Sequence, residues 1–281
     1  MRFGKIEYLN LLPFDVFLKK YRTSNSFKSA CNYKKSYPAK LNKEFLFRRI
    51  DAGFISSIAG MKAHYKAKVC KAGIIACKEV WSVLVLESSP ASDYQSATSN
   101  ALCLVLDLKG AVLIGDRALK YHYDCMYANS KNSNPKRHDS MKSASTYLTH
   151  KNLSSKNSNF QNSTFKHSNK PSQYYDMAKC WYDKTRLPFV FGRACFHTND
   201  TFYKNLIQDF NHKLEQGKRY KGVKIPHYIL MPYVNKIGIT KTFALKYLKH
   251  IYYKIEAKEH HALTLFYRYL RIKRIKAPKR F

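Results

Sequence analysis

Acidic residues are scarce in this chain of 281 residues, which has 18 Asp and Glu against 51 Lys and Arg and a formal net charge of +33. Such an excess is typical of proteins that bind nucleic acid, because clustered cations release counterions from phosphates. Here the cations are spread along the chain, from Lys19-Lys20 to Lys273-Arg274, and zinc-finger, basic-zipper and RNA-binding signatures are missing. We therefore expect a small anionic substrate and no nucleic-acid partner.

Long hydrophobic runs are also missing. No segment reaches the roughly 18 apolar residues of a membrane span, and the first residues lack the apolar region of an export signal. The seven cysteines include no C-x-x-C pair and no histidine partner at metal spacing, which fits reduced thiols in the cytosol. We expect no membrane association, no metal site and a cytoplasmic location.

Familiar catalytic motifs are absent as well. The sequence contains no G-x-S-x-G elbow, P-loop, G-x-G-x-x-G, H-E-x-x-H or paired acidic cluster. Most histidines lie in polar or basic surroundings, and nothing in the sequence pairs His64 or His197 with a partner. We therefore expect no cofactor, and any chemistry has to come from polar side chains and backbone groups.

Apolar residues make up 45% of the chain and aromatic residues 15%, which is enough for a folded core, and the length suits two lobes. Short apolar strands alternate with amphipathic helices, which predicts an α/β fold. The expected strands are 3–8, 53–55, 72–76, 82–87, 111–114 and 188–194, and the expected helices are 14–18, 42–49, 99–108, 202–214, 241–254 and 259–272.

One long stretch does not fit this alternation. Residues 127–173 are rich in Ser, Asn and Lys and poor in large aliphatic side chains, and residues 22–38 have a milder form of the same composition. Segments of this kind cannot bury enough apolar surface to offset the entropy of ordering. We interpret both as flexible surface insertions.

Polar clusters follow the expected strands at Asn10, at Ser56-Ser57, at 96–100 and at Gly115-Asp116. In open α/β folds, ligands bind beyond the carboxyl ends of strands, where helix N-termini offer free N–H groups. Hydroxyl groups at such places favour carboxylate or phosphate ligands. Ser and Thr are equally the usual helix N-caps, so each cluster taken alone also has a purely structural interpretation.

The order and spacing of the motifs resemble the MqnA family of the futalosine route to menaquinone, the chorismate dehydratases. The matching segments are "GKIEYLNLLPF" (4–14), "RIDAGFISSIA" (49–59), "GIIACKEVWSVLVLESSP" (73–90), "SATSNAL" (96–102), "VLIGDRAL" (112–119) and "YDMAKCWYDKTRLPFVFGR" (175–193). They cover most of the chain outside the two expected insertions.

This resemblance implies a two-lobed fold like that of type II periplasmic binding proteins, with the ligand cleft between the lobes. Residues 1–86 and 196–281 would form one lobe and residues 87–195 the other. It also implies removal of water from chorismate to give 3-[(1-carboxyvinyl)oxy]benzoate. A related two-lobed enzyme of the same pathway, which makes a dihydroxynaphthoate, and a binding protein for an aromatic carboxylate remain alternatives. The resemblance leaves the oligomeric state open.

The resemblance further assigns roles to individual residues. Asn10 would hold the enolpyruvyl group or the departing hydroxyl. Two candidates remain for the base: Asp116, which could equally hold a backbone turn, and the substrate's own enolpyruvyl carboxylate. The remaining expected site residues would bind carboxylate oxygens or shape the pocket: Ser56, Ser57, Ser82, Thr98, Ser99, Asn100, Thr185, Pro188 and Phe189. Arg186 stands where the family usually has glycine, so this turn is either rearranged or never needed a glycine.

Overall fold

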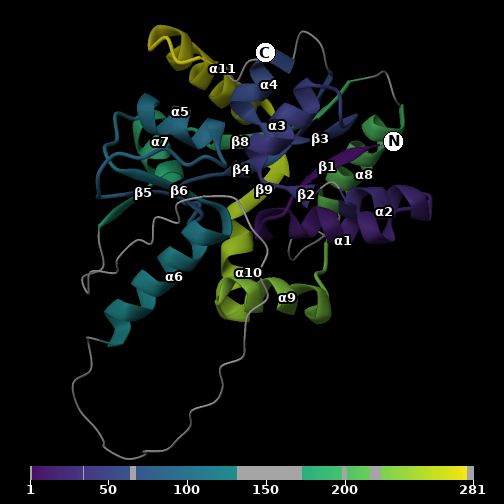
Figure 1. Ribbon diagram of the computed structural model, residues 1–281, viewed down its shortest axis with the longest axis horizontal. Helices are drawn as coiled ribbons and strands as arrows, with labels where there is room; N and C mark the ends of the chain where they lie inside the picture. Colours follow the sequence, from purple (N-terminus) through teal and green to yellow (C-terminus); the bar gives the residue numbers. More distant parts are fainter. Residues whose placement is uncertain are drawn as a thin grey trace, which may run out of the picture.

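The computed structural model describes residues 2–33, 35–63, 68–131, 173–197, 201–215 and 223–276. Their strands form a six-stranded sheet in the order β2-β1-β3-β8-β4-β9 and a three-stranded sheet in the order β6-β5-β7 (Figure 1). The strands are β1 (Phe3–Ile6), β2 (Lys35–Ser36), β3 (Ala52–Ser56), β4 (Lys68–Ala76), β5 (Val83–Leu86), β6 (Ala111–Ile114), β7 (Tyr174–Asp176), β8 (Phe189–Phe196) and β9 (Ile251–Lys254).

Helices surround both sheets. Figure 1 shows α5, α6 and α7 gathered around the three-stranded sheet and α1, α2 and α8 at the far end of the six-stranded one. The helices are η1 (Leu9–Leu11, a 3₁₀ turn), α1 (Leu12–Lys20), α2 (Asn25–Tyr33), α3 (Pro38–Leu46), α4 (Ser57–Ala63), α5 (Ala97–Val105), α6 (Gly115–Lys131), α7 (Met177–Thr185), α8 (Thr201–Glu215), α9 (His227–Ile237), α10 (Lys241–His250) and α11 (Ala257–Ile272). Among the described helices, none is both long and apolar enough to cross a bilayer.

The core of the six-stranded sheet is built from aromatic side chains. Phe3 of β1 and Phe54 of β3 pack with Phe14 of α1, at ring-centroid distances of 5.4 Å for Phe3–Phe14 and 5.2 Å for Phe14–Phe54. Phe210 of α8 closes the cluster edge-on, 5.0 Å from Phe14. Rings in such contact add to the free energy gained from burying their area. This cluster fixes β1 and the start of α1, and therefore the turn between them.

Strand β8 returns from the small sheet and inserts between β3 and β4, antiparallel to both. The chain crosses from the six-stranded to the three-stranded sheet between β4 and β5, and back between α7 and β8. The expected boundaries at 86/87 and 195/196 would place β5 in the lobe of the six-stranded sheet and β8 in the lobe of the three-stranded sheet, whereas each strand pairs in the other sheet. Because strand hydrogen bonding assigns each strand to its sheet, we propose earlier lobe crossings, at residues 77–82 and 186–188.

The expected strands are confirmed in position, but several other expectations need correction. Residues 251–254, expected to be helical, form edge strand β9 on β4. Residues 22–38 contain α2, because Phe27 is buried against Phe202 at 4.9 Å. Helix α6 extends through residues 127–131, so the expected insertion begins within a helix, and its positions 132–172 lie outside the described residues.

Arg186 occupies the C-terminal cap of α7 with φ 58° and ψ 18°, in the left-handed region. Its N–H donates to the carbonyl of Tyr182, as a capping glycine would do. The turn therefore has the conformation that favours glycine, at a cost of roughly 1 kcal/mol for a residue with a side chain. The departure from the family pattern leaves the local backbone in place.

Candidate active site

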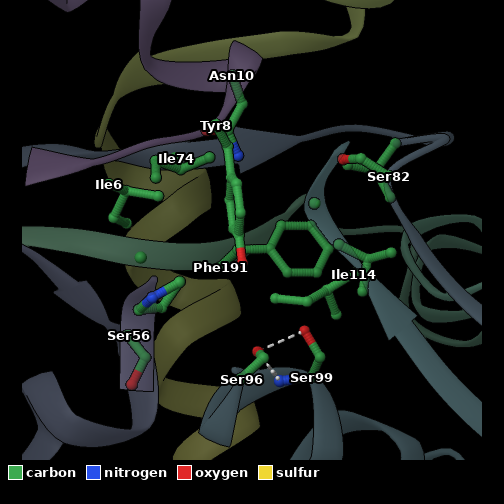
Figure 2. Close-up of a pocket in the computed structure, with 15 residues that line it drawn as sticks. Ile6, Tyr8, Asn10, Ser56, Ile74, Ser82, Ser96, Ser99, Ile114 and Phe191 are labelled. Atoms are coloured by element: carbon green, nitrogen blue, oxygen red, sulfur yellow. Dashed lines mark hydrogen bonds between the residues drawn. The ribbon is translucent and has the colours of Figure 1, made fainter. Parts of the chain in front are cut away.

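A cavity of about 40 Å³ lies where the two sheets meet. The six-stranded side contributes the segment after β1 and the end of β3, and the other side contributes the starts of α5 and α6. Figure 2 shows Tyr8 standing in the middle of the pocket, between Asn10 at one end and Ser96 and Ser99 at the other. The carboxyl ends of strands and the N-termini of helices therefore converge on one hollow.

Asn10 lines the pocket from η1, the tight turn that joins β1 to α1. Its side-chain Oδ1 is buried and has no hydrogen-bond partner among the described residues. Its backbone is held, because the carbonyl accepts a hydrogen bond from Tyr253 Oη and the neighbouring Leu9 N–H donates to Asp116 Oδ1 at 3.1 Å. A fixed backbone that presents an unpartnered polar side chain to a cavity indicates a ligand contact.

Asp116, at the start of α6, is not part of the pocket lining. Burial raises the pKa of its carboxyl group to about 6, against the lowering effect of the hydrogen bond from Leu9 N. The side chain thus ties α6 to η1 instead of facing the cavity. This placement favours a positioning role over that of a base.

Two adjacent serines after β3 point in different directions. Ser56 lines the pocket, and its hydroxyl accepts a hydrogen bond from Asn42 Nδ2 at 2.7 Å while Asn42 Oδ1 accepts from Ser56 N at 2.9 Å. Ser57 is fully buried outside the lining and donates its hydroxyl proton to the carbonyl of Val190 at 2.5 Å. Ser56 is therefore held at the pocket, whereas Ser57 ties α4 to β8.

The cluster at the start of α5 divides in the same way. Ser96 caps the helix by accepting from Ser99 N at 3.1 Å, and its hydroxyl donates to Ser99 Oγ at 2.8 Å; both serines line the pocket. The cap is thus Ser96 and not Ser99, which was expected to start this helix. Thr98 Oγ1 accepts instead from Ile58 N at 3.1 Å, and the Asn100 amide bonds the backbone N–H and carbonyl of Asp93.

Ser82 lines the pocket from the start of β5, and its hydroxyl accepts from Tyr247 Oη at 2.9 Å. The segment before it is fixed by Asp176, whose carboxylate accepts from the N–H groups of Val80 at 2.9 Å and Trp81 at 2.7 Å. Ser82 is therefore placed by the crossing between the sheets, where a hydroxyl can reach either side of the cavity.

Three expected pocket-wall residues serve the structure elsewhere. Thr185 Oγ1 donates to the carbonyl of Trp181 at 2.8 Å, and the carbonyl of Pro188 accepts from Trp181 Nε1 at 3.1 Å. Phe189 is buried between Trp181 and Phe266. The wall is formed instead by Phe191, two residues further along β8, whose ring centroid lies 4.7 Å from that of Phe189.

Sequence reasoning missed Tyr8, although it lies within the quoted opening motif. Its ring packs against Gly115, where an added Cβ would come within 2.7 Å of the ring. Gly115 also has φ 64°, so glycine suits this position on both counts. The sequence signal for Tyr8 was the Y-L-N order of the opening motif. This order places a tyrosine just beyond a buried strand and two residues before Asn10, and both residues line the pocket.

The pocket is lined mainly by apolar side chains, with a few polar groups among them. Among the described residues that line it, none carries a formal charge; it presents four serine hydroxyls, the Asn10 amide and the aromatic rings of Tyr8 and Phe191. No group of three or more His, Cys, Asp or Glu side chains within the described ranges is arranged to hold a metal ion. Hydroxyl groups and helix starts can bind carboxylates, and the flat rings suit a cyclic body between them.

Known proteins resemble this chain in sequence and in fold. The menaquinone biosynthesis family model matches residues 1–106 and 160–271. A chorismate dehydratase from Campylobacter jejuni subsp. jejuni is 37% identical over 268 residues, covering 95% of this chain and 96% of that protein.

Solved structures extend the likeness to the fold. A crystal structure of a protein from Archaeoglobus fulgidus has a TM-score of 0.63 at 11% identity, covering 98% of this chain and 97% of that one. The alkanesulfonate-binding protein SsuA from Xanthomonas axonopodis pv. citri has a TM-score of 0.50 at 12% identity, covering 99% and 94%. The expected fold is confirmed: two-lobed, α/β and of the periplasmic-binding-protein type.

Proposed function

Because the chain belongs to the menaquinone biosynthesis family, we propose that it is a chorismate dehydratase, a carbon–oxygen lyase that converts chorismate into 3-[(1-carboxyvinyl)oxy]benzoate and water. The observation that carries the proposal is the unpartnered amide oxygen of Asn10 in an uncharged pocket lined by hydroxyl groups and aromatic rings. The sequence identity to a chorismate dehydratase over nearly the whole chain supports the choice of substrate.

The reaction needs little chemical machinery from the protein. The C–H bond beside the enol ether breaks, its electron pair forms a new ring double bond, and the hydroxyl on the neighbouring carbon leaves with a proton as water. The ring carboxylate is conjugated to the carbon that loses the proton, so the developing carbanion is delocalised. Aromatisation supplies the driving force, and the protein contributes orientation and dipoles aimed at developing charge.

The pocket suits a doubly negative ring. The hydroxyls of Ser96 and Ser99 stand at the N-terminus of α5, where the helix dipole and free N–H groups favour a carboxylate. Ser56 and Ser82 offer hydroxyl groups from the other elements that line the cavity. The rings of Tyr8 and Phe191 form walls for the six-membered ring. We assign carboxylate binding to these four serines and leave Ser57, Thr98 and Asn100 as residues that shape the loops.

Asn10 would meet the hydroxyl that departs. A neutral amide can accept a hydrogen bond from the hydroxyl through Oδ1 and donate one through Nδ2 to the leaving oxygen. The proton from the ring carbon passes, in this proposal, to the enolpyruvyl carboxylate of the substrate itself, and from there to the departing hydroxyl, which leaves as water. The described pocket lining offers neither a carboxylate nor a histidine for that step, and Asp116 faces η1 instead.

Asp116→Asn is expected to keep kcat within about threefold of the wild type, because an amide oxygen can still accept the hydrogen bond from Leu9 N. Asp116→Ala removes that acceptor and should lower kcat roughly tenfold, since an unsatisfied buried N–H costs about 1–3 kcal/mol. Steady-state kinetics of both variants measures the difference. A loss of more than a hundredfold in Asp116→Asn, with a wild-type acid limb centred near pH 6, would make Asp116 the base instead.

The activity itself is tested by incubating the purified protein with chorismate and following the loss of diene absorbance, with the product identified by mass. We expect aromatisation with release of one water. Chorismate that binds but stays unchanged at high protein concentration would favour a binding protein. Turnover of a different substrate to a dihydroxynaphthoate would favour the related enzyme of the same pathway.

A further inference from the structure

Gln95 makes hydrogen bonds to both sides of the pocket. Within its own loop, its backbone N–H donates to Asp93 Oδ1 at 2.8 Å and its side-chain Nε2 donates to Tyr94 Oη at 2.7 Å. From the opposite side, Tyr8 Oη donates to Gln95 Oε1 at 2.6 Å and Ala39 N donates to the Gln95 carbonyl at 2.9 Å. Gln95 therefore joins segments that come from different sheets.

The loop that carries Gln95 is anchored to the side of the three-stranded sheet. Asp93 Oδ2 accepts from Ile114 N at 3.2 Å, at the end of β6, and from Arg117 Nη2 at 2.7 Å, on α6. These bonds remain within one side of the pocket. Tyr8 follows β1 and Ala39 lies in α3, which packs on β1 and β3 of the six-stranded sheet. The bonds from Tyr8 and Ala39 therefore cross the pocket, as do the bonds from Leu9 N to Asp116 and from Ile58 N to Thr98.

The serine hydroxyls cannot be reached from solvent in this conformation. Ser56, Ser82 and Ser99 are 2% exposed and Ser96 is 5% exposed. The rings of Tyr37, just before α3, and Tyr94, next to Gln95, also meet edge to face with centroids 5.5 Å apart. Entry and release of a ligand therefore require the two sides to separate. Separation breaks the bonds from Tyr8 and Ala39 to Gln95, together with those to Asp116 and Thr98, and leaves the anchors at Asp93 intact.

We propose that Tyr8 and Gln95 form a latch, a pair of positioning residues whose hydrogen bond holds the pocket closed around the bound dicarboxylate and controls its release. The identity of the ligand rests on the proposed function, whereas the latch itself does not. Burial raises the pKa of the Tyr8 hydroxyl, so this group keeps its proton and stays a donor. Because the Tyr8 ring also lines the pocket, closing the latch fixes one wall of the site.

Tyr8→Phe removes the hydroxyl and keeps the ring. We expect KM for chorismate and the release rate of the product to rise about five- to tenfold, a larger change than in kcat, because one net hydrogen bond favours the closed state by about 1 kcal/mol. Gln95→Ala should raise KM and the release rate by a similar factor. In the double variant both quantities should rise no further than in either single variant, because both changes remove the same hydrogen bond. The matched control is Tyr21→Phe, whose hydroxyl donates to Asp209 at 2.8 Å at an exposed place.

A second measurement needs no chorismate and so separates the latch from the proposed function. The Ala39 amide lies in the first turn of α3, where it has no partner within the helix, and its bond to Gln95 reports closure. In the free protein, hydrogen exchange at Ala39 should be at least about fivefold faster in Tyr8→Phe than in the wild type or in Tyr21→Phe. Unchanged exchange at Ala39, or kinetic effects that multiply in the double variant, would overturn the latch.

Discussion

Replacing Asn10 with alanine is expected to lower kcat for chorismate about 100-fold, which corresponds to about 2.7 kcal/mol of transition-state stabilisation. Removal of a single preorganised hydrogen-bonding group from a site of this kind typically costs that much. Asn10 Oδ1 is buried at the pocket without a partner in the described part of the chain, so this amide contributes little to the free energy of folding. Steady-state kinetics with chorismate measures the effect.

The thermal midpoint of Asn10→Ala should stay close to that of the wild type, because the backbone bonds of Leu9 and Asn10 do not involve the amide. Asn10→Asp keeps the shape but places a negative charge next to a dianionic substrate, so its kcat/KM should fall further still. Asn235→Ala is the matched control, at an exposed position of α9. Turnover within threefold of wild type in Asn10→Ala would remove Asn10 from the chemistry.

Gly115→Ala is expected to lower kcat/KM at least about 30-fold, roughly 2 kcal/mol. An added Cβ would lie 2.7 to 2.9 Å from three atoms of the Tyr8 ring, well inside normal contact distance. The ring therefore has to move into the space of the substrate or away from Gln95. A displacement of about 1 Å in an active site can cost a hundredfold in rate. Chorismate kinetics and a crystal structure of the variant measure both consequences.

Gly238→Ala provides the control for backbone strain. Gly238 has φ 74°, similar to the 64° of Gly115, so the left-handed backbone conformation costs alanine about 1 kcal/mol at both positions. At Gly238 the added Cβ meets only the flexible Lys120 side chain, at 3.1 Å. Both variants should lose similar thermal stability, and only Gly115→Ala should lose activity. An equal loss of activity in the two variants would show that strain, and not the Tyr8 contact, is responsible.

Local sequence patterns determined much of the fold. Apolar runs located the strands at 53–55 and 111–114 because a buried strand needs apolar side chains wherever its neighbours are placed. Residues 251–254 were misassigned to a helix because their pattern continues that of α10, and only pairing with β4 makes them a strand. Such pairing between distant segments is invisible in a short window of sequence.

The same distinction holds for the site. The sequence by itself located the polar clusters after the strands, and the order of its motifs identified the family. Only the tertiary structure decided which member of each cluster lines the pocket. Ser56 and Ser57 are neighbours in the chain, yet the Val190 carbonyl on β8 takes the hydroxyl of Ser57 while Ser56 is left at the pocket.

The partners that decide these directions come from far along the chain. Val190 is 133 residues from Ser57, and Gln95 is 87 residues from Tyr8. A hydroxyl or amide group points to whichever donor or acceptor the packed sheets bring within about 3 Å of it. Residue type and spacing predicted a small-anion site at the ends of the strands; the docking of two sheets determined which side chains line the pocket there.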